Sequence, residues 1–378
     1  MHDATLNAQA PGTTDQLETI KTVALASGVQ IGPDVLAWLG GPDSLTVHEY
    51  PTTGGITLVL PGEVLVNAAF DEAWCADSPL VLSLVDGHLE LRLGDTATPV
   101  LGVLPLPGYL ASVDACGRLV ADVAMSHADR VRVSPIEGCA FNCAFCDMPG
   151  RYVPRPLEQI LAALDVALRD DALPARHVLI SGGSPGQASA QQDYFRDVCV
   201  GVLRHARSMR NRDGRHLEVD IMMSARADAR AFVETMVEEG VHGFSFNVEA
   251  YSEAGAQAHL ARKHKLTRPH LQPMIEHAVA ALGHGTGRVR SLIIAGLETP
   301  EQTLDGVEWL ASLGCDPVLS PFRPARGTAM ADAAPLEPSV LSHILERSRR
   351  IARRHGVAIG PRCVPCQHNT LSFPWDVR

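Results

Sequence analysis

The chain has 378 residues, of which 46% are hydrophobic and 20% charged, a composition that excludes wholesale disorder and is typical of a packed globular protein. The formal net charge is −11 and the basic fragment Arg262–Lys265 is short, so we expect no nucleic-acid partner and a solvated loop at that fragment. No apolar stretch reaches transmembrane length, and residues 1–15 lack the basic start and apolar core of a secretory signal, so we expect no membrane partner.

Residues 1–125 are expected to form a small β-rich (α+β) N-terminal domain. After a polar start, Asp15–Ala26 is predicted to be helical. Short runs of alternating apolar residues then predict strands at Ser44–His48, Gly55–Leu60, Glu63–Val66, Leu80–Val85, Leu89–Leu93 and Pro99–Leu104. Asp86-Gly87 separates two of these runs and predicts a β-hairpin. Substrate recognition and packing across the next domain both stay open as its role.

Residues 126–335 alternate between strand-like and helix-like segments. The predicted strands are Val131–Pro135, His177–Ser181, Leu217–Met223, Gly243–Glu249, Val289–Ala295 and Pro317–Ser320. The predicted helices are Pro156–Arg169, Gln191–Ser208, Ala229–Glu239, Pro269–Leu282 and Glu301–Leu313, and a further helix, Pro338–Arg354, follows beyond residue 335. This alternation favours parallel βαβ units and an α/β fold, and the loops after the strands are expected to carry the site residues.

Three cysteines, Cys139, Cys143 and Cys146, follow the first of these strands with the spacing C-x3-C-x2-C. The spacing supplies three thiolates from one loop, whereas a cubane iron–sulfur cluster needs four outer ligands, so one iron stays open for a small molecule. The alternative is a structural zinc site, but such sites prefer four protein ligands and the loop offers no fourth Cys or His, only Asp147.

This spacing, with the aromatic Phe145 before the last cysteine, resembles the signature of the radical S-adenosylmethionine (SAM) superfamily. The resemblance implies a partial (βα)6 barrel whose cluster loop follows the first strand. It also implies a 4Fe–4S cluster held by Cys139, Cys143 and Cys146, with the open iron chelated by the amino and carboxylate groups of SAM. An electron from the cluster, supplied by a flavodoxin- or ferredoxin-type donor, would cleave SAM to methionine and a 5′-deoxyadenosyl radical.

Several strand ends are similar to SAM-binding elements of this family, most closely to those of its biotin-synthase-like branch. By this resemblance the expected cofactor-binding residues are Phe145, Gly182, Gly183, Ser184, Ser224, Arg226, Asn247, Glu249 and Gly296. Asn247 and Glu249 are two apart on a strand and should face the same side, as in a pair that binds the ribose hydroxyls. Arg226 is expected either to pair with the SAM carboxylate or to begin the next helix at the surface.

Two side chains are the candidates for contacts with the substrate. Glu249 is placed to serve there as well as at SAM. Arg323 follows the last strand and is expected either to hold an anionic substrate group or to cap the barrel mouth.

Residues 336–378 are expected to form a C-terminal helix and a tail that contains Cys363, Cys366 and His368. Four interpretations of this tail stay open. It holds an auxiliary iron–sulfur cluster completed by Cys315 or an outside ligand, it holds zinc as Cys-Cys-His plus one more ligand, it is a redox dithiol, or it contacts substrate.

The resulting hypothesis is a radical SAM enzyme that abstracts hydrogen from a small molecule or a peptide, in a biosynthetic or tailoring pathway. One alternative is transfer of the 3-amino-3-carboxypropyl group of SAM, because the tail is faintly similar to that of the enzyme that builds arsinothricin. Another alternative is a non-catalytic iron–sulfur or zinc protein. Nine cysteines in a chain with a cluster motif imply a reducing, cytoplasmic location.

Overall fold

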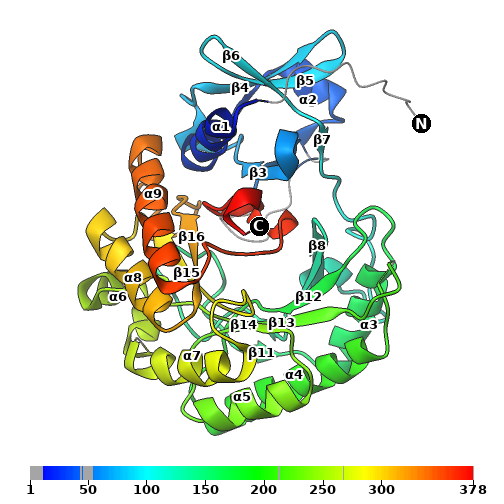
Figure 1. Ribbon diagram of the computed structural model, residues 1–378. Helices are drawn as coiled ribbons and strands as arrows, with labels where there is room; N and C mark the ends of the chain where they lie inside the picture. Colours follow the sequence, from blue (N-terminus) through cyan, green and yellow to red (C-terminus); the bar gives the residue numbers. More distant parts are fainter. Residues whose placement is uncertain (1–11, 43–44, 46–53, 212, 267, 378) are drawn as a thin grey trace.

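The computed structural model describes residues 12–42, 45, 54–211, 213–266 and 268–377. Figure 1 shows a curved sheet covered by helices on its outer side, a smaller N-terminal part above it, and the C-terminal tail between the two. The strand predicted at Ser44–His48 lies outside the described residues, apart from Leu45. Within the described part of the chain, no helix is both long and apolar enough to cross a membrane.

The main sheet has seven strands in the order β16-β15-β14-β13-β12-β9-β8. They are β8 (Ala124–His127), β9 (Arg130–Val133), β12 (His177–Ile180), β13 (Glu218–Met223), β14 (Gly243–Phe246), β15 (Val289–Ala295) and β16 (Asp316–Pro321). The strands from β9 to β16 pair in parallel, with Val131 opposite Val178, which confirms the predicted partial (βα)6 barrel. The antiparallel β8 is an additional strand that the sequence analysis did not predict.

Helices follow the strands because their apolar residues recur at helical spacing and bury one face. They are α3 (Leu157–Leu168), α4 (Ser189–Arg207), α5 (Ala229–Glu238), α6 (Glu253–His259), α7 (Arg268–Leu282), α8 (Pro300–Ser312) and α9 (Pro338–His355). In α8 the start is fixed locally, since Thr299 and Gln302 form a capping box and Pro300 takes the first helical position. The fragment predicted as a solvated loop, Arg262–Lys265, instead lies in a 3-10 helix that spans Ala261–Leu266, with Lys263 buried.

The N-terminal part contains α1 (Thr14–Ser27), α2 (Pro33–Trp38) and two small sheets. One sheet has the order β1-β4-β5-β6, with β1 (Gln30–Ile31), β4 (Leu80–Val85), β5 (His88–Leu93) and β6 (Thr96–Pro99). The other has the order β3-β2-β7, with β2 (Ile56–Leu60), β3 (Val64–Ala68) and β7 (Gly102–Val103). The predicted hairpin is confirmed: Val85 pairs with His88, and both Asp86 and Gly87 have the positive φ that a two-residue turn of this kind requires.

The tail after α9 packs along the free edge of the barrel sheet. The amide of Gly360 donates to the carbonyl of Pro317 and the amide of Leu371 to that of Leu319, both at 2.8 Å. From the N-terminal part, the buried Lys21 ammonium donates to the carbonyls of Gln367 and Ser372 at 2.8 and 2.7 Å. The tail is therefore bound to both parts of the molecule, which fixes Cys363 and Cys366 against the barrel.

Candidate active site

The loop that carries Cys139, Cys143 and Cys146 begins after β9 and the short strand β10 (Ile136–Glu137). Backbone hydrogen bonds fold it on itself, since the amide of Cys139 donates to the carbonyl of Pro149 at 2.9 Å. The Cys139 sulfur accepts from the amides of Phe141 and Ser184 at 3.4 and 3.3 Å. All nine cysteines lie in the described residues, and none forms a disulfide.

The turn at Gly182 and Gly183 holds this loop by backbone contact. The Ala140 amide donates to the Ser184 carbonyl at 3.0 Å. A Cβ atom at Gly183 would lie 1.6 Å from the carbonyl oxygen of Gly138, and one at Gly182 would lie 2.6 Å from the Ser134 hydroxyl oxygen. Glycine is thus required at position 183 because the two backbones approach closely, and glycine is favoured at position 182 by a φ of 115°. The contact of Ser184 with Cys139 is made by its backbone amide.

Burial raises the pKa of the Cys143 thiol to about 12 and that of Cys146 to about 11. The neighbouring Glu249 adds to the shift at Cys143, and the other two cysteines of the loop contribute to it. The thiols of Cys143 and Cys146 are therefore neutral at ordinary pH unless a cation replaces their protons, as metal binding does.

A cavity of about 1440 Å³ fills the interior of the barrel. At the carboxyl ends of the strands it is lined by the three cysteines of the loop and by Phe145, Gly182 and Ser184. At the amino ends it is lined by residues of the strand starts and of the tail, among them Asp129, His177, Cys363 and Cys366. One cavity therefore connects two chemically different ends of the barrel.

Asn247 and Glu249 both line this cavity, although β14 ends at Phe246 and Glu249 has a positive φ of 61°. The Asn247 side-chain oxygen accepts from the Ser245 hydroxyl at 2.7 Å and from the Leu292 amide at 3.3 Å. The buried Lys263 ammonium lies 2.7 Å from Glu249 Oε1. Glu249 Oε2 is buried and has no hydrogen-bond partner among the described residues.

Lys263 also lines this cavity and is not among the residues predicted from the sequence. Burial lowers its pKa, but the carboxylate of Glu249 raises it above its usual value overall. Its sequence neighbours are basic and suggest a solvated loop, so no local pattern marks it for burial.

Three of the expected cofactor-binding residues have other surroundings. Arg226 is buried, its Nη2 donates to Asp228 at 2.8 Å, and its guanidinium lies over the Phe232 ring. These contacts argue against the expected pairing of Arg226 with the SAM carboxylate. Ser224 is buried beside it, and neither residue lines the cavity. Gly296 also lies outside the cavity lining, at a φ of 114° that favours glycine.

Arg323 lines the cavity but is engaged with the N-terminal part. Its guanidinium donates to the side-chain oxygen of Asn67 at 2.8 Å and to the carbonyl of Leu25 at 3.3 Å. These contacts favour the structural alternative, in which Arg323 closes the barrel mouth.

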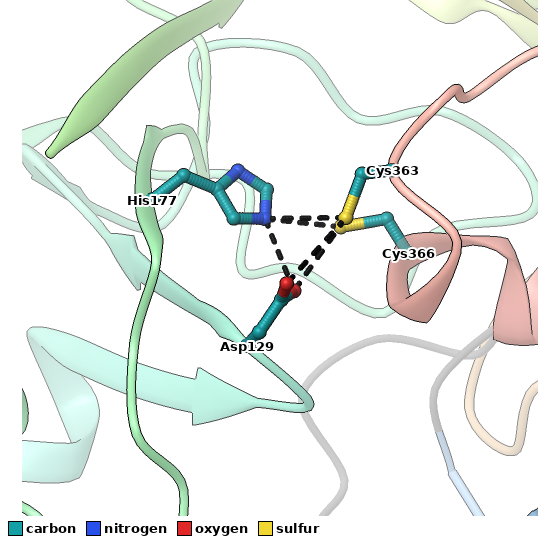
Figure 2. Close-up of side chains that lie close together, drawn as sticks. All are labelled: Asp129, His177, Cys363 and Cys366. Carbon is teal, nitrogen blue, oxygen red and sulfur yellow. Dashed lines mark hydrogen bonds and ion pairs between the residues drawn. The ribbon is translucent and has the colours of Figure 1, made fainter. Parts of the chain in front are cut away.

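A second cluster of side chains lies at the amino ends of the strands, where Figure 2 shows Asp129, His177, Cys363 and Cys366 directed at one another. Their donor atoms all lie within 4.8 Å of one another. Burial alone would lower the pKa of His177, but the Cys366 thiolate and Asp129 raise it to about 10. The hydrogen bond from Cys363 and the charge of His177 hold the pKa of Cys366 well below its usual range.

The set of tail ligands expected from the sequence is therefore corrected at two positions. His368 does not join the cysteines, because its Nδ1 donates to the Pro365 carbonyl at 2.9 Å and its ring packs on that of His127 at 4.1 Å. Cys315 is fully buried and is not part of the cluster. Asp129 and His177 take their places, from positions 234 and 186 residues before Cys363.

A family model described as the radical SAM superfamily matches residues 133–320. No curated protein matches the chain. Among solved structures, the chain is similar to the radical SAM methyltransferase TsrM from Kitasatospora setae, with 14% identity, 54% of this chain and 38% of that chain covered, and a TM-score of 0.41. It is also similar to HydG, a maturase of the FeFe-hydrogenase, with 13% identity, 60% of this chain and 50% of that chain covered, and a TM-score of 0.45. A third similar structure is a radical SAM methyltransferase from Sphaerobacter thermophilus, with 17% identity, 77% of this chain and 81% of that chain covered, and a TM-score of 0.42. The chain spans less than two thirds of the first two of these proteins.

Proposed function

Because the chain belongs to the radical SAM superfamily of enzymes, we propose that Cys139, Cys143 and Cys146 hold a 4Fe–4S cluster and that SAM binds beside them in the barrel cavity. The proposal rests on one observation. All three cysteines line the same cavity of about 1440 Å³, at the carboxyl ends of the parallel strands.

The residues present fit such a cluster. Three thiols from one loop leave one outer position of a cubane open. The amides of Phe141 and Ser184 donate to the Cys139 sulfur and thereby hold it in place in the loop. The Gly182-Gly183 turn keeps bulky atoms out of the region next to the loop. When bound, the cluster supplies one electron that cleaves SAM to methionine and a 5′-deoxyadenosyl radical.

The role of the chain's own side chains is to orient SAM and the substrate in a cavity that excludes water. Glu249 Oε2 is a buried acceptor without a partner among the described residues, so it fits a hydroxyl or ammonium donor of SAM or of the substrate. Lys263 binds the other oxygen and holds the carboxylate in place. Asn247 has its side-chain oxygen occupied, which leaves its amide N–H groups for a ligand in the cavity.

We further propose that the substrate is a small polar molecule or a peptide side chain and that the reaction begins with abstraction of a hydrogen atom from it. Polar and charged side chains also line the cavity near the amino ends of the strands, among them Asp220, Arg290 and His242, which pair with one another. A flavodoxin- or ferredoxin-type protein would supply the electron. The nine free cysteines support a reducing location such as the cytoplasm.

The proposal is tested on protein reconstituted anaerobically with iron and sulfide and then given dithionite and SAM. We expect about four irons per chain, the content of one cubane, and 5′-deoxyadenosine as the nucleoside product. Both should be lost in the variant Cys139→Ala/Cys143→Ala/Cys146→Ala. Methylthioadenosine instead would identify 3-amino-3-carboxypropyl transfer, and an intact cluster without any cleavage product, also in the presence of cell extract, would contradict the enzymatic role.

A further inference from the structure

We propose that Asp129, His177, Cys363 and Cys366 bind one zinc ion at the amino end of the barrel. The four residues come from three separate segments: the turn between β8 and β9, the start of β12, and the tail. Zinc would thereby join the C-terminal tail to the first two parallel strands of the barrel. The site is distinct from the proposed cluster loop, because Cys139 lies beyond the carboxyl end of β9 and a four-residue strand spans roughly 13 Å.

The distances between donor atoms fit a single tetrahedral ion. Zinc bonds of about 2.0–2.3 Å give edges of roughly 3.3–3.8 Å between the ligands of a tetrahedron. His177 Nε2 lies 3.3 Å from Cys366 Sγ, 3.6 Å from Cys363 Sγ and 3.3 Å from Asp129 Oδ1. Cys363 Sγ lies 3.5 Å from Asp129 Oδ1. All four donor atoms lie within 4.8 Å of one another, and Figure 2 shows the four side chains directed at one another.

The same distances argue against an auxiliary iron–sulfur cluster, which is another of the interpretations that the sequence of the tail left open. The outer ligands of a cubane bind different irons, so they lie farther apart than the ligands of one ion. In addition, only two of the four donors are thiolates, and no other cysteine lies in this cluster among the described residues. Two thiolates, an imidazole and a carboxylate form a ligand set that zinc accepts.

The backbone holds the donors in place before any metal binds. The Arg176 amide donates to the Asp129 carbonyl at 2.8 Å, which joins the segments before β12 and β9. The Cys366 amide donates to the Cys363 carbonyl at 3.1 Å and closes the turn between the two cysteines. The Gln367 side-chain amide donates to the Pro361 carbonyl at 2.9 Å. A site that is ordered in advance loses little conformational entropy on binding, which favours tight binding.

The charge of the surroundings also fits. Two thiolates and a carboxylate exceed the charge of Zn²⁺ by one negative charge, and cationic groups lie close to the cluster. Arg130 follows Asp129 directly in the chain and lines the same cavity. Arg290 lies at the same end of the cavity, where it also pairs with Asp220 at 2.7 Å. Thiolate ligands at this buried position are thus compensated rather than isolated.

The test is the zinc and iron content of the cluster-reconstituted protein of 378 residues after dialysis against a weak chelator. We expect about one zinc per chain in the wild type, and a loss of about tenfold or more in Cys363→Ala/Cys366→Ala and in His177→Ala. The matched control is His368→Ala, which removes the tail histidine that packs on His127, and it should keep the zinc. Iron content should be the same in all four proteins.

Two further measurements separate this site from the cluster loop and from misfolding. The variant Cys139→Ala/Cys143→Ala/Cys146→Ala should lose iron and keep zinc, so a failure of the proposed cluster leaves the zinc result readable. Cobalt(II) added to wild-type protein stripped of zinc should give the intense visible bands of tetrahedral thiolate coordination, and Asp129→Asn should alter these bands in a protein whose circular dichroism is unchanged. Zinc content that does not depend on Cys363, Cys366 and His177, or iron that is lost with the tail cysteines, would overturn the proposal.

Discussion

Gly183→Ala is expected to abolish binding of the proposed cluster while the protein still folds. The new Cβ would lie 1.6 Å from the Gly138 carbonyl oxygen and 2.9 Å from the Cys139 Cα atom. Because Cβ contacts in real proteins essentially never fall below 3.0 Å, the loop must move by about 1.4 Å. Overpacking of this kind costs about 1–3 kcal/mol, which a folded chain tolerates, whereas functional constellations are held to within about 0.5 Å. The shift of the loop is therefore larger than a functional site tolerates, whereas the cost of overpacking stays below the free energy of unfolding.

The assay is iron and sulfide content after anaerobic reconstitution, together with 5′-deoxyadenosine formed from SAM and the melting temperature. We expect the melting temperature to fall by roughly 2–12 °C, since a loss of about 1–3 kcal/mol lowers it by about 2–4 °C for each kcal/mol. Gly150→Ala is the matched control, because this glycine belongs to the same loop and its Cβ would lie 3.6 Å from Asn142, an ordinary contact. A Gly183→Ala protein with the iron content and SAM cleavage of the wild type would refute the steric argument.

Three more predictions follow from buried charges. Lys263→Met leaves the Glu249 carboxylate buried without its cation and should lower the free energy of unfolding, measured by urea denaturation, by about 3–5 kcal/mol. Lys263→Arg keeps a cation at this position and should lose less stability than Lys263→Met. Glu249→Gln should raise the SAM concentration needed for half-maximal cleavage while the iron content stays unchanged, and an unaltered SAM dependence would remove Glu249 from the proposed site. Burial lowers the pKa of Lys21 to about 7, which is below its value in the unfolded chain. Between pH 7 and 10 the unfolded state therefore binds more protons than the folded state. The stability of the wild type should accordingly rise with pH over this range, relative to that of Lys21→Met. Equal pH slopes for the two proteins would show that Lys21 stays charged.

The sequence by itself determined the features that depend on neighbours along the chain. The spacing of Cys139, Cys143 and Cys146 predicts the loop chemistry, and alternating apolar runs predict six parallel strands with their helices, which the sheet confirms. Asp86-Gly87 predicts a turn because both residues accept a positive φ. Such patterns are local: steric preference and helical or strand periodicity act within a few residues, and the residues themselves therefore reveal them.

The tertiary structure decided which distant side chains meet. Asp129 and His177 join Cys363 and Cys366 because β9 pairs with β12 in one register and the tail docks on the same end of the barrel. His368, nearer in sequence, turns away onto His127. In the same way Lys263 pairs with Glu249, and Arg323 turns from the substrate region to Asn67. The sequence around a charged side chain does not reveal its partner. The attraction between the two groups becomes strong only after folding has brought them together and away from water.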